Sequence, residues 1–152
     1  MKNSFKLLIL SLFFVVFSSC KDNDKETIGC LNMYVPLTAN ITYVDANGTN
    51  LLFGNNPTYP VENIKIYTKN GENQTPLTFK VYKEAKFISI TIEKQESGTF
   101  FIELKPNLVD KITYNTKNPA NDPCTDLVLT KLQQNEVNVQ YDDKTQLWTL
   151  KK

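Results

Sequence analysis

The chain has 152 residues with 17 Lys, no Arg, 16 acidic residues and no His, and its formal net charge is +1. The absence of His removes the commonest general base and the usual ligand of zinc and copper. Without Arg there is no bidentate clamp for phosphate or guanine, and the lysines form no basic patch. Nucleic acid is therefore not an expected partner.

The first 19 residues have the layout of a secretory signal peptide. Lys2 and Lys6 precede an apolar run over residues 7–17, and two serines separate this run from Cys20. The run is too short for a membrane-spanning helix, which needs about 20 apolar residues. The alternative is an ordinary signal peptide that a chance cysteine follows.

Small residues followed directly by a cysteine resemble the lipobox of bacterial lipoproteins, although Phe17 is bulkier than the usual Leu. The resemblance implies that residues 1–19 are removed and that Cys20 carries lipid. Residues 21–26 form a charged stretch that resembles the surface-export signal of lipoproteins of Bacteroidota. A solvated linker has the same composition, since charged linkers extend. We therefore expect a lipid anchor in the outer membrane, residues 20–29 as a tether, and a position at the cell surface.

The two remaining cysteines fall inside the expected domain, residues 30–152, which is long enough for one sizeable core. Cys30 precedes the first strand-like run and Cys124 precedes a late one. In an exported, oxidising setting such a pair can form a disulfide. Closing so long a loop would be worth up to ~4–5 kcal/mol in the chain-entropy model. Two separate buried thiols are the alternative.

Alternation of apolar and polar residues with a period of two dominates residues 33–150, as half-buried strands require. In chain order, the apolar members are Ala39, Ile41 and Tyr43; Ile64 and Ile66; Leu77, Phe79 and Val81; Ile88, Ile90 and Ile92; Phe100, Ile102 and Leu104; Ile112 and Tyr114; Leu127 and Leu129; Val137, Val139 and Tyr141; and Leu147 to Leu150. Eight or nine strands at hairpin spacing indicate an antiparallel sandwich or barrel. The fold class we expect is an all-β antiparallel β-sandwich, Ig-like or transthyretin-like.

Turn signals separate these runs. Residues 45–48, 70–71, 95–98 and 142–145 combine Asp, Asn, Ser and Gly types, and Gly98 suits a positive-φ position. Residues 132–135 are the one place where a helical turn is expected. Two longer polar loops, residues 53–60 and 117–123, either carry function or simply connect strands.

Few residues of this chain are candidates for catalysis or metal binding. A glycosidase needs only two carboxylates, but Glu93, Glu103 and Asp110 fall at outward or strand-end positions where a solvated charge is expected. Asp45 to Asn50 has oxygen ligands at alternate positions, as the start of a calcium loop does, but it is also a plain hairpin turn. We expect no enzymatic activity, no metal and no cofactor.

Three aromatic residues suggest a binding face. Tyr67, Tyr82 and Phe101 point outward if the Ile and Leu faces point into the core. Exposed aromatics on neighbouring strands can stack on sugar rings or contact a protein. Alternatively, another layer of the fold covers them.

Residues 44–52, Val-Asp-Ala-Asn-Gly-Thr-Asn-Leu-Leu, resemble the Asp-x-x-Gly-x-x-Leu-Leu stretch of small lipoproteins of Bacteroidota, in which an Ile-x-Ile strand follows. The resemblance implies a β-sandwich and no known activity. Together these patterns predict a non-catalytic surface lipoprotein that binds glycan or protein. The alternative is a structural, accessory or toxin-inhibitor lipoprotein of the cell envelope.

Overall fold

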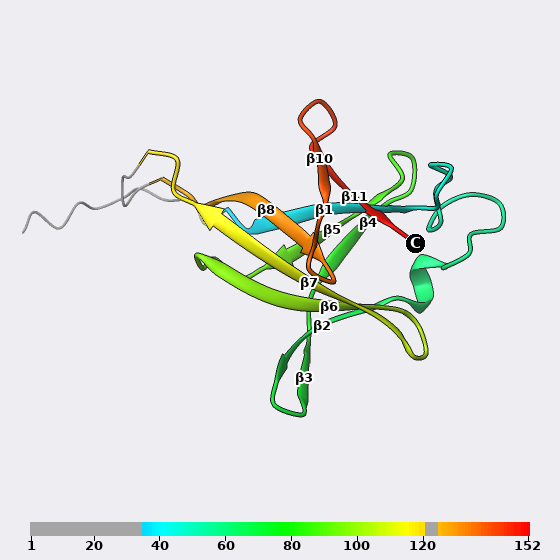
Figure 1. The fold of residues 1–152 in the computed structure, drawn as a ribbon, viewed down its shortest axis with the longest axis horizontal. Coiled ribbons are helices and arrows are strands. Elements are labelled where there is room, and N and C mark those ends of the chain that lie inside the picture. The colour runs from blue at the N-terminus through cyan, green and yellow to red at the C-terminus, as the bar shows by residue number, and fades with distance from the viewer. Residues whose placement is uncertain (1–34, 121–124) are drawn as a thin grey trace, which may run out of the picture. The chain divides into compact units, whose positions relative to one another are not determined.

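The computed structural model of the chain describes residues 35–120 and 125–152. All of them belong to the unit Leu31–Lys152, which is separate from Met1–Cys30. Two packed sheets make up this unit, and a single 3-10 turn, η1 (Val61–Asn63), is the only helical element among the described residues. The predicted all-β sandwich is therefore confirmed (Figure 1).

The first sheet has five strands in the order β10-β11-β1-β5-β4. Their bounds are β1 (Leu37–Val44), β4 (Phe79–Tyr82), β5 (Phe87–Ile92), β10 (Gln140–Asp142) and β11 (Leu147–Lys151). Strand β1 is central: it pairs antiparallel with β5 and parallel with β11. The first and last strands of the described chain are thus neighbours.

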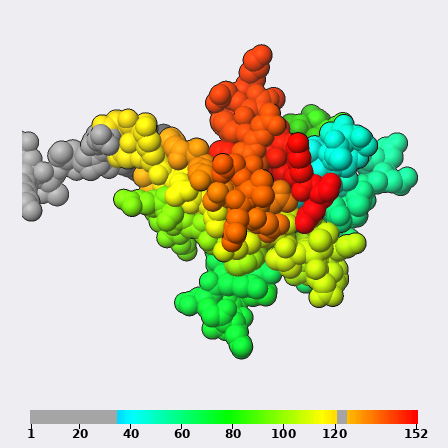
Figure 2. All heavy atoms as spheres, in the orientation of Figure 1, coloured from blue at the N-terminus to red at the C-terminus, as the bar shows by residue number. Residues whose placement is uncertain are grey.

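The second sheet has six strands in the order β3-β2-β6-β7-β8-β9. Their bounds are β2 (Lys65–Asn70), β3 (Asn73–Pro76), β6 (Ser97–Lys105), β7 (Leu108–Lys117), β8 (Val128–Gln134) and β9 (Val137–Asn138). All of its pairings are antiparallel. Figure 2 shows the β2–β3 and β10–β11 hairpins standing out from the body of this unit.

The core lies between the sheets and consists of the inward members of the period-two runs. The fully buried side chains among the predicted ones are Ala39, Ile41, Tyr43, Ile88, Ile90, Phe100, Ile102, Leu104, Ile112 and Leu150. Burying each large one contributes roughly 1.5–3 kcal/mol relative to exposure in water. The alternation therefore predicted the inner faces of β1, β5, β6 and β7 correctly.

One predicted strand is in fact two. Residues 137–141 were expected as a single run, but β9 pairs with β8 in one sheet and β10 pairs with β11 in the other. The chain crosses between the sheets at Val139, which is half-buried against the core. Because of this crossing, Val137 and Tyr141 at its two sides are exposed rather than buried.

A second crossing explains another difference. Strand β3 is exposed along its whole length and has no alternation of apolar residues, so only the Asn70–Gly71 turn signals it. After β3 the chain is still hydrogen-bonded to β2, because the Leu77 N–H donates to the Ile66 carbonyl. It then enters the other sheet as edge strand β4. At that edge Val81, predicted as a core residue, is exposed.

Two local predictions are wrong. Residues 132–135 form the end of β8 and the start of a tight turn with positive φ at Asn135 and Glu136, not a helical turn. Gly98 has no positive φ and lies within β6, directly opposite Tyr114. The Tyr114 ring and Gln95 occupy the space that a Cβ at Gly98 would need. Glycine is required there for close packing, not for turn geometry.

We therefore expect Gly98→Ala to lower the free energy of unfolding by about 1–3 kcal/mol, since the added methyl overpacks the site. Urea unfolding of the purified domain measures this. Ser97→Ala, at the neighbouring exposed position, is the control and should change stability by no more than about 0.5 kcal/mol. Equal stability of Gly98→Ala and the wild type would contradict the packing argument.

Candidate functional site

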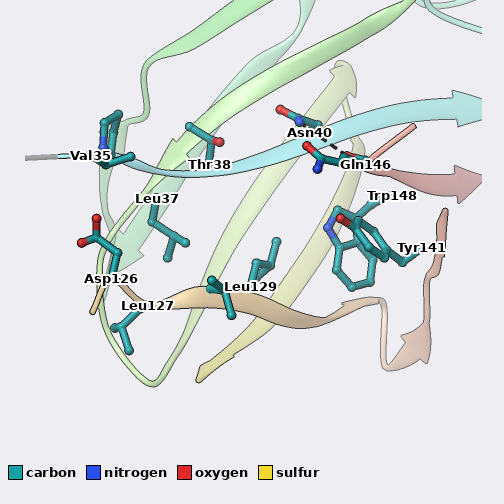
Figure 3. A pocket seen from close by; sticks show the side chains of 12 residues that line it. Val35, Leu37, Thr38, Asn40, Asp126, Leu127, Leu129, Tyr141, Gln146 and Trp148 are labelled. Carbon is teal, nitrogen blue, oxygen red and sulfur yellow. Dashed lines mark hydrogen bonds between the residues drawn. The ribbon is translucent and has the colours of Figure 1, made fainter. Parts of the chain in front are cut away.

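The candidate site is a cleft of about 270 Å³ between the start of β1, the hairpin β10–β11 and strand β8 (Figure 3). Its volume is slightly below the usual range for small-molecule sites, about 300–1,000 Å³. The lining residues are Val35, Pro36, Leu37, Thr38, Asn40, Asp126, Leu127, Val128, Leu129, Tyr141, Gln146 and Trp148. Both sheets contribute, so the sandwich itself forms the cleft.

The cleft gathers exposed apolar side chains. Leu37 and Trp148 are buried and belong to the core, whereas Val35, Val128 and Tyr141 are exposed. These three are among only seven large apolar side chains that are exposed in the described part of the chain. A concentration of exposed apolar side chains in one concave place is typical of a binding site rather than of ordinary surface.

An aromatic pair forms one wall of the cleft. Tyr141 on β10 lies directly opposite Trp148 on β11, and their ring centroids are 4.6 Å apart at an interplanar angle of 38°. Trp148 is buried, while Tyr141 remains 40% exposed. Trp148 thus supports the Tyr141 ring from behind and leaves part of it available for a ligand to stack on.

Polar groups complete the lining. The Asn40 side-chain amide donates to the Gln146 carbonyl at 3.4 Å, and Gln146 has φ 56° at the end of the β10–β11 turn. Asp126 forms an ion pair with Lys94 at 2.5 Å. A few directional donors and acceptors beside an aromatic ring can orient a polar ligand that stacks on that ring.

Other hollows are larger but have less suitable linings, and one of about 490 Å³ beside Ser97 and Asn115 has no aromatic residue in its lining. Another, of about 390 Å³, includes Tyr114, whose hydroxyl already donates to the Glu93 carbonyl and accepts from Gln95. A third, of about 510 Å³, is bordered by the exposed ion pair Lys65–Glu103. The structure gives none of these hollows an exposed aromatic ring.

The aromatic face expected from the sequence does not exist as one surface. Tyr67 and Phe101 are neighbours on β2 and β6 and stack at 5.7 Å, with the Lys69 ammonium 4.8 Å from the Phe101 ring centroid. Tyr67 is only 4% exposed, so its predicted exposure is wrong and the alternative, that the fold covers it, holds for this residue. Tyr82 lies in the other sheet and stacks on Phe87, because β4 belongs to the opposite layer.

The loop from Asp45 to Asn50 uses its oxygens within itself. The Asp45 carboxylate accepts the backbone N–H groups of Asn47 and Thr49, each at 2.8 Å. Asn50 Oδ1 accepts those of Leu52 and Phe53 at 2.9 Å, which fixes the start of loop 53–60. These bonds are those of a hairpin turn, the second of the two readings from the sequence.

Asp110 is the main polar residue that sequence reasoning misplaced. It was expected to be solvated, but its residue is 0% exposed. Oδ1 accepts from Lys152 Nζ at 2.6 Å and from Asn135 Nδ2 at 2.7 Å. Oδ2 accepts from the Tyr43 hydroxyl and from Gln134 Nε2, both at 2.9 Å.

A sequence signal for this burial existed. Asp110 is two residues before Ile112 and four before Tyr114, so it lies on the inward face of β7. The four donors satisfy both carboxylate oxygens, as a buried charge requires. Burial, and then the charge of Asp110, raise the pKa of Tyr43 well above its ordinary value.

The other predicted residues have simpler outcomes. Glu103 forms the surface ion pair with Lys65, and Glu93 is exposed. Cys20, Cys30, Cys124 and part of loop 117–123 lie outside the described residues.

In the described ranges no group of three or more acidic, Cys or His residues could hold a metal. None of the described segments is a helix long and apolar enough to cross a membrane.

Comparisons of the chain with protein-family models, curated proteins and solved structures found no match. Fold and site therefore define the protein only by its architecture: a β-sandwich whose described residues form a cleft with a half-exposed aromatic ring.

The position of Tyr43 predicts a loss of stability in alkali. Unfolded Tyr43 loses its proton near pH 10, whereas burial keeps the folded side chain protonated. Above about pH 10 the unfolded state thus binds fewer protons, and the free energy of unfolding falls by up to about 1.4 kcal/mol per pH unit for this group. Urea unfolding from pH 8 to pH 11 should show a shallower decline for Tyr43→Phe. An unchanged decline would contradict this assignment.

Proposed function

We propose that this protein is a non-catalytic binding module for a saccharide, held at the bacterial cell surface by lipid on Cys20. The cleft beside Tyr141 is the binding site. The observation that carries this proposal is the half-exposed Tyr141 ring, which Trp148 supports and which lies beside the side chains of Asn40 and Thr38. Sugar rings offer apolar C–H faces and hydroxyl edges, and this combination matches a ring with polar neighbours.

Binding without catalysis fits the chemistry of the lining. The chain has no His, and Asp126 is the one carboxylate among the lining residues, where it forms an ion pair with Lys94. Hydrolysis of a glycosidic bond ordinarily needs two carboxyl groups on opposite sides of that bond. A peptide ligand would use the same apolar wall, and the binding experiment below distinguishes it from a sugar.

The lipid anchor rests on the sequence of residues 1–26 alone. The disulfide between Cys30 and Cys124 is part of the same proposal, since export places both thiols in an oxidising compartment. A binding domain at the end of a charged tether is suited to capture ligands outside the cell.

The binding proposal predicts the effect of removing one ring. A soluble form of residues 21–152 should bind at least one saccharide on a glycan array, and Tyr141→Ala should weaken that binding at least about tenfold, from lost stacking and buried area of about 1.5 kcal/mol. Calorimetric titration with the sugar found on the array measures the change.

Tyr82→Ala is the matched control for this experiment. Tyr82 is also exposed, at 44%, and also stacks on an aromatic neighbour with centroids 4.6 Å apart, but it lies outside the cleft. Its removal should leave sugar binding unchanged. Binding of peptides but not sugars, or equal losses in both variants, would contradict the proposal.

The anchor predicts a change of location. Replacing Cys20 with Ser removes the acylated thiol, so the protein should leave the membrane fraction and lose surface labelling by an impermeant reagent. Cell fractionation and immunoblotting measure this, and Cys30→Ser is the control that should remain with the membrane. A Cys20→Ser protein that still fractionates with the outer membrane would disprove lipid anchoring at this residue.

A further inference from the structure

Asp110 and two of its partners, Lys152 and Asn135, bring together the groups of an amide-forming reaction. A single carboxylate oxygen, Asp110 Oδ1, accepts from the Lys152 amine at 2.6 Å and from the Asn135 amide nitrogen at 2.7 Å. The amine and the carboxamide are therefore neighbours across one oxygen. An amine, a carboxamide and a shared acid are the groups needed to exchange one amide for another.

The carboxamide is held in place before any reaction. Asn135 Oδ1 accepts the backbone N–H of Lys111 at 2.9 Å, and the Asn135 backbone N–H donates to the Lys111 carbonyl at 2.8 Å. The first of these bonds also polarises the side-chain carbonyl toward nucleophilic attack. Because both the backbone and the side chain of Asn135 are held, little conformational freedom would be lost when the carboxamide is attacked.

The amine is also positioned by the fold. The Lys152 backbone N–H donates to the Val44 carbonyl at 3.0 Å, and its side chain, 21% exposed, reaches to the fully buried Asp110. Two uncharged donors on the other oxygen, from Tyr43 and Gln134, hold the carboxylate in one orientation. A buried carboxylate in direct contact with an ammonium can accept its proton and generate the nucleophilic amine.

We propose that Lys152 and Asn135 form an intramolecular amide bond, with Asp110 as the proton carrier. Asp110 takes a proton from the Lys152 ammonium, and the free amine attacks Cγ of Asn135 to form a tetrahedral intermediate. The Cγ–Nδ2 bond then breaks, Asp110 returns the proton to the leaving nitrogen, and ammonia departs. The leaving nitrogen already carries two hydrogens, so the returned proton completes ammonia. The attacking nitrogen keeps one hydrogen as the amide N–H and gives its other proton to Asp110, which passes it to ammonia, so that ammonium is released and no oxidant, reductant or water is consumed.

The neighbouring carbonyl groups are less suitable partners. Gln134 Nε2 contacts the other oxygen of Asp110 and also donates to the Lys151 carbonyl, while its Oε1 accepts the Lys151 N–H. Gln134 therefore does not share an oxygen with the lysine amine. Attack on Asp110 itself would need a second acid to protonate it, and its four hydrogen-bond partners include no carboxyl group.

The bond would join the two sheets. Asn135 lies in the turn that follows β8 of the six-stranded sheet, and Lys152 follows β11 of the five-stranded sheet. This amide bond would close the same end of the sandwich as the ion pair between Lys152 and Asp110. Unlike the ion pair, the amide bond would persist when the protein unfolds.

Peptide mass spectrometry tests this directly on the mature protein, purified in detergent and digested with trypsin after denaturation. Cleavage follows Lys131, Lys144 and Lys151, so the linked product is peptide 132–144 carrying the mass of one additional lysine less one ammonia. We expect this species to replace the unmodified peptide in most molecules, with fragment ions that locate the added lysine at Asn135.

Two variants separate the reaction from other losses of ammonia. Lys152→Arg keeps the ion pair with Asp110 but lacks the amine, and it should give only unmodified peptide 132–144. Asp110→Asn should do the same wherever circular dichroism shows the sheet structure to be retained. Unmodified peptide from the folded wild type would overturn the proposal, and so would a loss of ammonia at Asn135 that persists in Lys152→Arg.

Discussion

The sandwich depends on one buried charge. Asp110 projects from β7 into the space between the sheets, and both of its oxygens are occupied by donors from four other positions. Breaking a buried ion pair typically costs about 3–5 kcal/mol, because it leaves the remaining charge without compensation. The end of β1, the β8–β9 turn and the segment after β11 are therefore fixed relative to one another by a single carboxylate.

The cleft beside Tyr141 is located at the other end of the same strands. The start of β1 and Trp148 of β11 line the cleft, whereas Tyr43 and Lys152, further along, contact Asp110. Parallel pairing of β1 with β11 sets this arrangement, since both strands run from the cleft toward the carboxylate. One end of the sandwich is closed by polar bonds, and the other contains the cleft.

Periodicity predicted the parts of the molecule that a local pattern governs. Ile88, Ile90 and Ile92 are inward because alternate side chains of a strand share a face. It failed where the chain changes sheets, as at Val139, since no local pattern records a crossing. Tyr141 was assigned to the core for this reason, and the cleft was missed. Asp110 was misjudged because residue type was given more weight than its position on the inward face of β7.

The central position of β1 has a mechanical consequence. Any pull on the chain ahead of Pro36 enters the domain through β1, which is hydrogen-bonded along both edges to β5 and β11. Tension along a strand loads those bonds together, in shear, instead of opening them one at a time from an edge. With the proposed lipid at Cys20 and a ligand in the cleft, the load would pass between them near the start of β1. The rest of the core would remain largely free of strain.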